Sequence, residues 1–194
     1  IYFYLGTYEE ATYKFTSVRN TLNSKFAENI GDIESQWWAF EFEWQGDVAL
    51  SPFGEKTADK LTITKSAADG NGDIVQWIPL HGGKPYTFSV WLWSPVAKTI
   101  NLSIARHYLP VVVASKQITL SPEPTRYSVT GITPSDALYD VDIGRSIFAG
   151  KPTTFGTEVG DVLYAWGAQL EVGEQMTDYD AKEVALPSSV REWR

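Results

Sequence analysis

The alternation of side chains along residues 161–171, which read DVLYAWGAQLE, constrains the fold more than any other feature. Successive side chains of a β-strand point to opposite faces of the sheet, so this segment divides into two sets. The more apolar set is predicted to be buried and comprises Val162, Tyr164, Trp166, Ala168 and Leu170. The other set is predicted to face outwards and comprises Asp161, Leu163, Ala165, Gly167, Gln169 and Glu171. On this assignment, Trp166→Ala would cost about 3–5 kcal/mol of stability.

Short segments of this kind recur along the chain, with Gly, Pro, Asn or Asp between them. Such spacing is typical of an antiparallel sandwich or barrel, and no segment sustains a helical period over ten residues. We therefore predict an all-β fold. An aromatic strand is expected to end at residue 44, and further strands are expected at residues 60–66, 73–80, 84–94, 99–108, 111–120, 125–132, 145–150 and 161–171.

Composition and charge exclude several classes of protein. The chain has 194 residues, of which 43% are hydrophobic, which suits one domain with a substantial core. Cysteine is absent, so neither a disulfide framework nor a thiolate zinc site is available. The net charge is -8 and no basic cluster occurs, which disfavours a nucleic-acid partner. The longest apolar run, residues 108–115, is much shorter than the roughly 20 residues that span a bilayer, so membrane insertion is not expected.

Three sequence blocks occur in an order that is typical of one family. They are TADKLT at residues 57–62, GGKPYTFSVWLWS at 82–94 and YAWGAQLEVG at 164–173. With these blocks, residues 20–179 resemble a carbohydrate-binding-type jelly-roll module of bacteriophage virion proteins, such as tail fibres and head decorations. The resemblance implies a jelly-roll β-sandwich on the surface of the phage particle, with a surface glycan, other virion proteins and copies of itself as partners. It also allows a structural calcium ion near the ends of the sandwich, for which no ligands are assigned.

The resemblance divides the chain into three parts. Residues 20–180 are predicted to form the sandwich, residues 1–19 an N-terminal β arm or the end of a preceding domain, and residues 181–194 a C-terminal tail. The family usually continues into a SYIPT-like segment, which this chain lacks, so no role is carried over to its last fifteen residues. We expect the terminal segments to contact other copies of the chain, because an unpaired strand exposes a pairing edge. The alternative is that both ends fold back onto their own sandwich.

The candidate ligand-binding residues lie on the outward faces of three predicted strands. In the strand at 84–94, Trp91 and Trp93 alternate with an apolar set, and an indole offers a flat apolar surface with a polar handle. Asn101 and His107 face outwards on the next strand, and Gln169 on the last one, where amides and imidazoles can bind sugar hydroxyls. If the strands are arranged as in the family, these residues line one concave surface. The alternatives are that the tryptophans are buried under a loop and that the polar residues form a solvated sheet face.

The segment DGNGD at residues 69–73 allows two interpretations. Asp69, Asn71 and Asp73 have the spacing of the first ligands in a calcium loop, but the twelfth position is Leu80 rather than Glu. We favour a hairpin turn, because Asn-Gly between strands is the strongest short-range hairpin signal.

Catalysis is not expected. His81 and His107 are the two histidines, and no nucleophile elbow, phosphate-binding loop or HExxH motif is present. Glu41 and Glu43 share a strand face and are predicted to be solvent-facing rather than to form a glycosidase pair. The sequence therefore favours a noncatalytic virion surface module for glycan attachment or virion assembly. The alternatives are a secreted carbohydrate-binding module of a bacterial polysaccharide-degrading enzyme and a purely structural cement protein.

Overall fold

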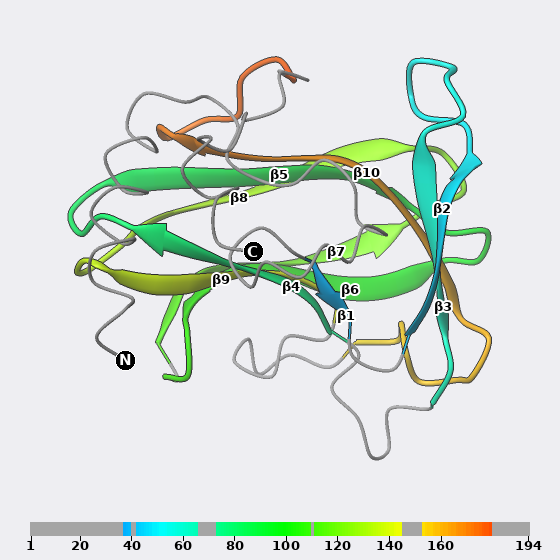
Figure 1. Cartoon of the computed structure of the whole chain (residues 1–194), viewed down its shortest axis with the longest axis horizontal. Helices are drawn as coiled ribbons and strands as arrows, with labels where there is room; N and C mark the ends of the chain where they lie inside the picture. The colour runs from blue at the N-terminus through cyan, green and yellow to red at the C-terminus, as the bar shows by residue number, and fades with distance from the viewer. Residues whose placement is uncertain (1–36, 40–41, 66–72, 110, 145–152, 180–194) are drawn as a thin grey trace, which may run out of the picture.

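The chain folds into a β-sandwich in which two antiparallel sheets of five strands face each other (Figure 1). The computed structural model describes residues 37–39, 42–65, 73–109, 111–144 and 153–179, and these residues contain no helix. The predicted all-β antiparallel sandwich is therefore confirmed. The predicted N-terminal arm at residues 1–19 and the C-terminal tail at 181–194 lie outside the described residues.

Consecutive strands along the chain often belong to different sheets, so the chain crosses repeatedly between the two sheets. Sheet I contains, in spatial order, β1 (Trp38–Ala39), β4 (Asp73–Leu80), β9 (Ala137–Gly144), β6 (Lys98–Arg106) and β7 (Val112–Leu120). Sheet II contains β2 (Phe42–Ala49), β3 (Ala58–Ile63), β10 (Val162–Val172), β5 (Pro85–Trp93) and β8 (Thr125–Ile132). Every pair of neighbouring strands is antiparallel.

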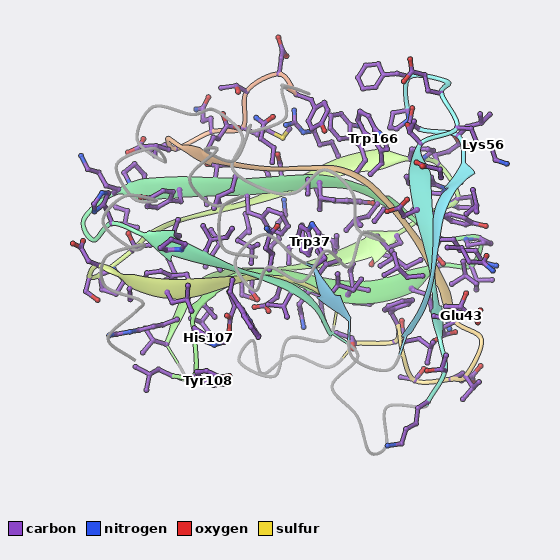
Figure 2. The ribbon with its side chains drawn as sticks, viewed as in Figure 1. Trp37, Glu43, Lys56, His107, Tyr108 and Trp166 are labelled. Atoms are coloured by element: carbon purple, nitrogen blue, oxygen red, sulfur yellow. The ribbon has the colours of Figure 1, made fainter. Side chains whose placement is uncertain are left out.

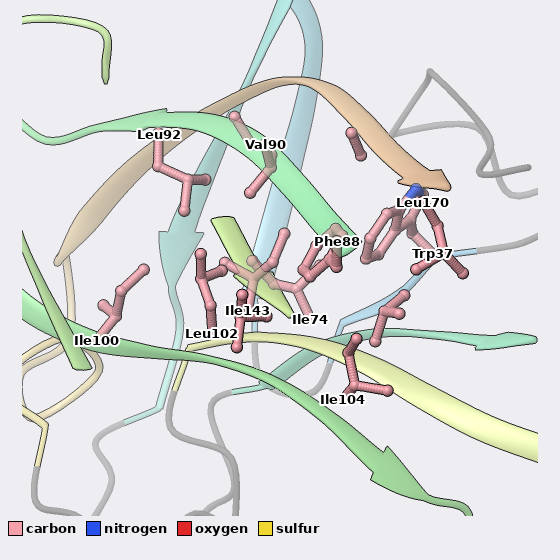
Figure 3. Packing of buried hydrophobic residues seen from close by; sticks show 14 of the residues in the cluster. Trp37, Ile74, Phe88, Val90, Leu92, Ile100, Leu102, Ile104, Ile143 and Leu170 are labelled. Carbon is pink, nitrogen blue, oxygen red and sulfur yellow. The ribbon is translucent and has the colours of Figure 1, made fainter. Parts of the chain in front are cut away.

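The hydrophobic core fills the space between the sheets, as Figure 3 shows. The central strands contribute alternate side chains to it, because only one face of each sheet points inwards. From β5 these are Phe88, Val90 and Leu92, and from β6 they are Ile100, Leu102 and Ile104, all of them fully buried. Trp37 enters the same core, with its ring centroid 6.4 Å from that of Phe88.

Most predicted strands coincide with observed ones, but β9 was missed. The aromatic strand expected to end at residue 44 corresponds to two strands in different sheets, β1 and β2, and β2 continues to Ala49. β9 pairs with β4 and β6 in the middle of sheet I, although its sequence, ALYDVDIG, contains two aspartates. Aspartate is depleted in strands, yet here Tyr139, Val141 and Ile143 face the core while the aspartates alternate on the outer face. The strand predicted at residues 145–150 lies outside the described residues.

The predicted hairpin at residues 69–73 is wrong in its pairing. The strands that flank this segment, β3 and β4, belong to different sheets, so the connection crosses the sandwich instead of joining neighbours. The turn itself lies outside the described residues. Asn-Gly reports that the chain turns, but it does not report which strand pairs with which.

A β-bulge at Gly167 corrects the predicted faces of β10. Trp166 pairs with Trp91 and Gln169 with Ser89, so two residues of β10 oppose one residue of β5. The bulge shifts the alternation by one residue, and Gly167 adopts a φ of 62°. Before the bulge the buried residues are Leu163 and Ala165, and after it they are Ala168 and Leu170. Tyr164 and Trp166 therefore lie half-buried on the outer face, and the prediction that they are core residues was wrong.

Gly167→Ala tests the packing of the bulge. A Cβ at this position would lie 3.1 Å from Cε3 of Trp91 and 3.3 Å from Cε2 of Tyr179, and the positive φ disfavours any side chain. We expect a loss of about 1–3 kcal/mol in a urea denaturation experiment. The matched control is Gly83→Ala, where φ is 70° but no atom lies within 4 Å, so this variant carries the backbone cost alone. Equal losses in the two variants would contradict close packing of Trp91 against the bulge.

Candidate functional site

The predicted site residues lie on opposite outer faces of the sandwich, not on one concave surface. Trp91, Trp93 and Gln169 belong to β5 and β10 of sheet II, whereas Asn101 belongs to β6 of sheet I and His107 follows that strand directly. Figure 2 shows Trp166 on the upper side of the sandwich and His107 with Tyr108 on the lower side. The prediction of a shared surface was wrong because β6 and β10 occupy different sheets. Each outer face is therefore considered separately.

The outer face of sheet II carries a compact group of aromatic rings, here called the aromatic cluster. It comprises Phe53, Trp91, Trp166 and Tyr179. The ring centroids of Trp91 and Trp166 are 5.3 Å apart, because the two residues are direct cross-strand partners. Both indoles contact Tyr179, at 5.5 Å and 4.7 Å. Most of these contacts are edge-to-face or tilted, so the rings pack against one another and do not form a flat platform.

Polar contacts hold the aromatic cluster in place. The indole Nε1 of Trp166 donates a hydrogen bond of 3.0 Å to the hydroxyl of Thr57. The guanidinium carbon of Arg126 lies 4.5 Å from the centroid of the Trp91 ring, in a cation–π contact. Phe53 stands on a turn between β2 and β3 and is 68% exposed. Trp93 stacks on Tyr164 at 5.4 Å and is only 7% exposed, which fits the predicted alternative of a buried indole.

Residues 173–179, here called the strap, fold back onto the outer face of sheet II beside the aromatic cluster. The backbone N–H of Thr177 donates to Oε1 of Glu171 at 2.9 Å, and its hydroxyl donates to Oε2 at 2.6 Å. Nε2 of Gln169 donates to the same Oε1 at 3.0 Å. Arg126 donates to the carbonyl of Thr177 at 2.6 Å and to the hydroxyl of Ser89 at 3.0 Å. Gln169 is consequently 0% exposed, so an external ligand does not reach it while the strap is in place.

The outer face of sheet I carries a different arrangement, here called the His107 site. Nδ1 of His107 lies 2.6 Å from Oδ1 of Asp140, and the imidazole contacts two aromatic rings in tilted geometry. Its centroid is 4.8 Å from that of Trp77 and 3.7 Å from that of Tyr108. Asp140 is the cross-strand partner of Trp77, which explains how β9 and β4 bring carboxylate, imidazole and indole together. Tyr108 is 81% exposed, and its φ of 57° is uncommon for a residue other than glycine.

The turn after β6 fixes this unusual backbone. The N–H of Arg106 donates to the carbonyl of Val111 at 2.8 Å, and the N–H of His107 donates to the carbonyl of Leu138 at 3.0 Å. These bonds connect the turn to β7 and β9, so Tyr108 is held in place although it is solvent-exposed. Strained residues that are held by their surroundings concentrate at functional sites.

Further polar side chains lie beside the His107 site on the same face. The hydroxyl of Ser103 donates to Oδ2 of Asp142 at 2.9 Å, and the two residues are cross-strand partners. Asn101 and Ser103 are fully buried, and Asp142 is nearly so. Burial raises the pKa of Asp140 above its ordinary value, while the charge of His107 and its hydrogen bond lower it.

Sequence reasoning proposed His107, which lies at this site, and Asn101, which is fully buried on the same face. It did not propose Trp77, Tyr108 or Asp140. The strand containing Trp77 was predicted correctly, and alternation alone would have placed Trp77 on the outer face with Val75. Asp140 was missed because β9 was not recognised as a strand. No sequence signal indicates the positive φ of Tyr108, because it depends on the pairing of β6 with β7 and β9.

The end of the sandwich carries a buried ion pair beside a pocket. At the sandwich end a shallow pocket of about 240 Å³ lies between Ser94, Lys98 and Asp161. Nζ of Lys98 is 2.5 Å from Oδ1 of Asp161, whose second oxygen accepts the N–H of Gly156 at 3.0 Å.

No group of three or more histidine, aspartate or glutamate side chains within the described ranges is arranged to hold a metal ion, and calcium binding stays a prediction. Glu43 is exposed, as predicted, and Glu41 lies outside the described residues. In the part of the chain that the structure describes, no helix is long and apolar enough to cross a bilayer.

Solved structures similar to this chain are mostly carbohydrate-binding modules. A CBM4 structure matches 79% of this chain and 97% of its own, with a TM-score of 0.56 and 16% identity. The TmCBM61 structure in complex with β-1,4-galactotriose matches 80% of this chain and 100% of its own, with a TM-score of 0.55 and 13% identity. The enzymatically active domain of bacteriophage CBA120 tailspike protein 4 matches 80% of this chain but only 22% of its own, with a TM-score of 0.54 and 12% identity. The predicted jelly-roll fold is confirmed by these likenesses. No family model matches the chain, and no curated protein matches it in sequence.

The raised pKa of Asp140 leads to a testable expectation. Because burial disfavours the carboxylate, we expect the Asp140 carboxyl carbon to titrate above the ordinary aspartate midpoint in a ¹³C NMR experiment. Stability from this group is gained as the pH falls through the raised folded pKa, because the folded state binds the proton more tightly than the unfolded state. His107→Ala removes the contacts that lower this pKa, so the midpoint should rise further.

The control for this titration is His81→Ala. His81 lies near Asp136, with its Nδ1 3.6 Å from Oδ1, beyond the end of β4 and away from Asp140. This variant should leave the Asp140 midpoint unchanged. A midpoint at or below the ordinary value would contradict the assignment of burial as the dominant cause, and a fall on removing His107 would contradict the lowering effect assigned to His107.

Proposed function

We propose that this chain is a noncatalytic glycan-binding module and that its ligand binds at the His107 site. The observation that carries the proposal is the group of Trp77, His107 and Tyr108, whose rings are in tilted contact. Asp140 holds His107 in this group on the outer face of sheet I, and Tyr108 is exposed. A sugar ring offers an apolar C–H face and a rim of hydroxyls, so its receptor needs aromatic surface beside hydrogen-bonding groups. At the His107 site, Tyr108 presents an exposed ring and hydroxyl beside the largely buried imidazole of His107.

The site is also preorganised. The Asp140 carboxylate orients the imidazole, and the turn holds Tyr108 in a conformation that a free tyrosine rarely adopts. A receptor whose side chains are already fixed loses less conformational entropy on binding, which favours affinity. The aromatic cluster on sheet II is the weaker candidate, because its rings pack mainly against one another and the strap covers the polar groups beside them.

The biological context that we propose is the surface of a bacteriophage particle, where the module attaches a tail fibre or a head decoration to a glycan or contributes to assembly. The likeness to a phage tailspike domain supports this context. The likenesses to CBM4 and CBM61 favour the alternative, a secreted carbohydrate-binding module that accompanies a polysaccharide-degrading enzyme. Mass spectrometry of purified virions from the source would separate the two, because only a virion protein copurifies in fixed stoichiometry with the capsid protein.

Calorimetric titration of oligosaccharides tests the proposed site. We would use β-1,4-galactotriose, xylohexaose and cellohexaose as probes and measure the affinity of the wild type and of Tyr108→Ala and Trp77→Ala. Each substitution should weaken binding at least about tenfold, which corresponds to about 1.4 kcal/mol, because an aromatic anchor dominates the energy of a small interface.

The matched control is Phe53→Ala, which removes an exposed aromatic ring from the opposite face. Its affinity should equal that of the wild type. If Phe53→Ala weakens binding while Tyr108→Ala does not, the ligand binds sheet II instead. Absence of binding to every probe by the wild type would leave the proposal without support for these glycans.

A further inference from the structure

The strap covers a strip of polar side chains on the outer face of sheet II. Ser89, Gln169 and Glu171 are buried, although all of them lie on the face that points away from the core. Gln169 and Glu171 contact Thr177 of the strap, and Ser89 accepts a hydrogen bond from Arg126, which also donates to the Thr177 carbonyl. The strip ends at Trp91, whose ring is covered on one side by Arg126. Hydrogen-bond donors and acceptors therefore lie next to an aromatic ring, and the strap forms hydrogen bonds with them.

The contacts of Thr177 are those that a bound sugar hydroxyl would make. Its Oγ1 donates to Oε2 of Glu171 at 2.6 Å and lies 3.4 Å from the amide nitrogen of Gln169, which can donate to it. A hydroxyl group is both a donor and an acceptor, so a carboxylate and an amide satisfy it together. In this respect the strap occupies the strip as an internal ligand.

Stability alone gives a weak reason for this arrangement. A buried charged or polar network usually stabilises no better than well-packed apolar residues of similar size, because its groups must first lose their hydration. Buried polar groups are best attested as devices that fix a register or hold a switch. The polar side chains of this strip thus resemble those of a ligand-binding surface, although the strap covers them.

The strap is built so that it can leave without disturbing the core. It begins at Gly173, where φ is 148°, and Glu174, Gln175, Met176 and Asp178 are exposed along it. Hydrogen bonds of Gly173 with Pro85 and Thr87 anchor its first residue to β5. Beyond this residue, the strap contacts sheet II through the hydrogen bonds of Thr177, including the one that its carbonyl accepts from Arg126, and through the ring of Tyr179. None of the fully buried inter-sheet residues belongs to it.

We propose that the strap is an autoinhibitory latch over a second glycan-binding surface, formed by Ser89, Gln169, Glu171 and Trp91. The occupant that displaces it is a neutral oligosaccharide, whose hydroxyls replace that of Thr177 and whose ring packs on the indole. The second surface shares only its ligand class with the His107 site and lies on the opposite sheet. Binding there is opposed by the free energy of strap closure, so it is weak while the latch is closed.

The experiment uses the full chain with Tyr108→Ala, which weakens binding at the His107 site. In this background, Thr177→Val removes the hydroxyl contacts, and the double change Thr177→Val with Tyr179→Ala also removes the aromatic contact. Hydrogen exchange of the amide at position 177 reports opening, because that N–H donates to Glu171 when the strap is closed. Titration with β-1,4-galactotriose, xylohexaose and cellohexaose reports binding, and Met176→Ala on the exposed side of the strap is the matched control.

We expect faster exchange at position 177 and a rise in affinity of about tenfold or more for one probe, with no change in Met176→Ala. Exchange that accelerates without any gain in affinity would overturn the proposal, and so would exchange that stays slow in the double variant. If the double variant does not fold, hydrogen exchange at position 177 is measured in the Tyr108→Ala protein at saturating oligosaccharide. The proposal requires faster exchange of this amide, because the bound oligosaccharide displaces the strap. A gain in the opened variant without wild-type binding would support this surface while the His107 site fails, so the two proposals are separable.

Discussion

Both halves of β10 place side chains in the core, and the bulge at Gly167 makes this possible because it shifts the alternation by one residue. Leu163 and Ala165 precede the bulge and Ala168 and Leu170 follow it, and all four are buried between the sheets. Without the extra residue, one half would place its small and aliphatic side chains outwards. The left-handed φ that the bulge requires favours glycine, and the absence of a Cβ lets Trp91 and Tyr179 approach closely. The same local geometry therefore sets the core packing of the strand and the position of the aromatic cluster above it.

The fold could be predicted from the sequence to the extent that it depends on local alternation. β4, β5, β6, β7 and β8 match their predicted segments closely, because each has a consistent apolar face and is bounded by turn residues. Alternation fails where the period changes within a strand, as at Gly167, and where acidic residues occupy the outer face, as in β9. Neither the assignment of strands to sheets nor the crossing from β3 to β4 is encoded in a local pattern, because both depend on contacts between distant segments.

The same limit explains the outcome for the candidate site. Trp91, Trp93, Asn101 and His107 do face away from the core, as alternation predicts, but the sheet order separates them. Burial also depends on what covers a face, and the outward position of Gln169 did not imply exposure because the strap covers it. Residue type and alternation along the strand thus predicted which side chains face away from the core. They could not predict which of these side chains meet solvent.

The two outer faces differ in how their polar groups are satisfied, and this difference bears on function. On sheet II, the carboxylate of Glu171 accepts one hydrogen bond from Gln169 and two from Thr177 of the strap. The strap carries no core residue, so its two hydrogen bonds can be exchanged for those of an external molecule. On sheet I, the carboxylate of Asp140 is satisfied by His107, whose backbone is itself bonded to β9. A ligand at the His107 site would therefore add to an existing arrangement, whereas a ligand on sheet II would have to replace one. Binding to sheet I should accordingly be the less costly in reorganisation, which is why we place the primary ligand there.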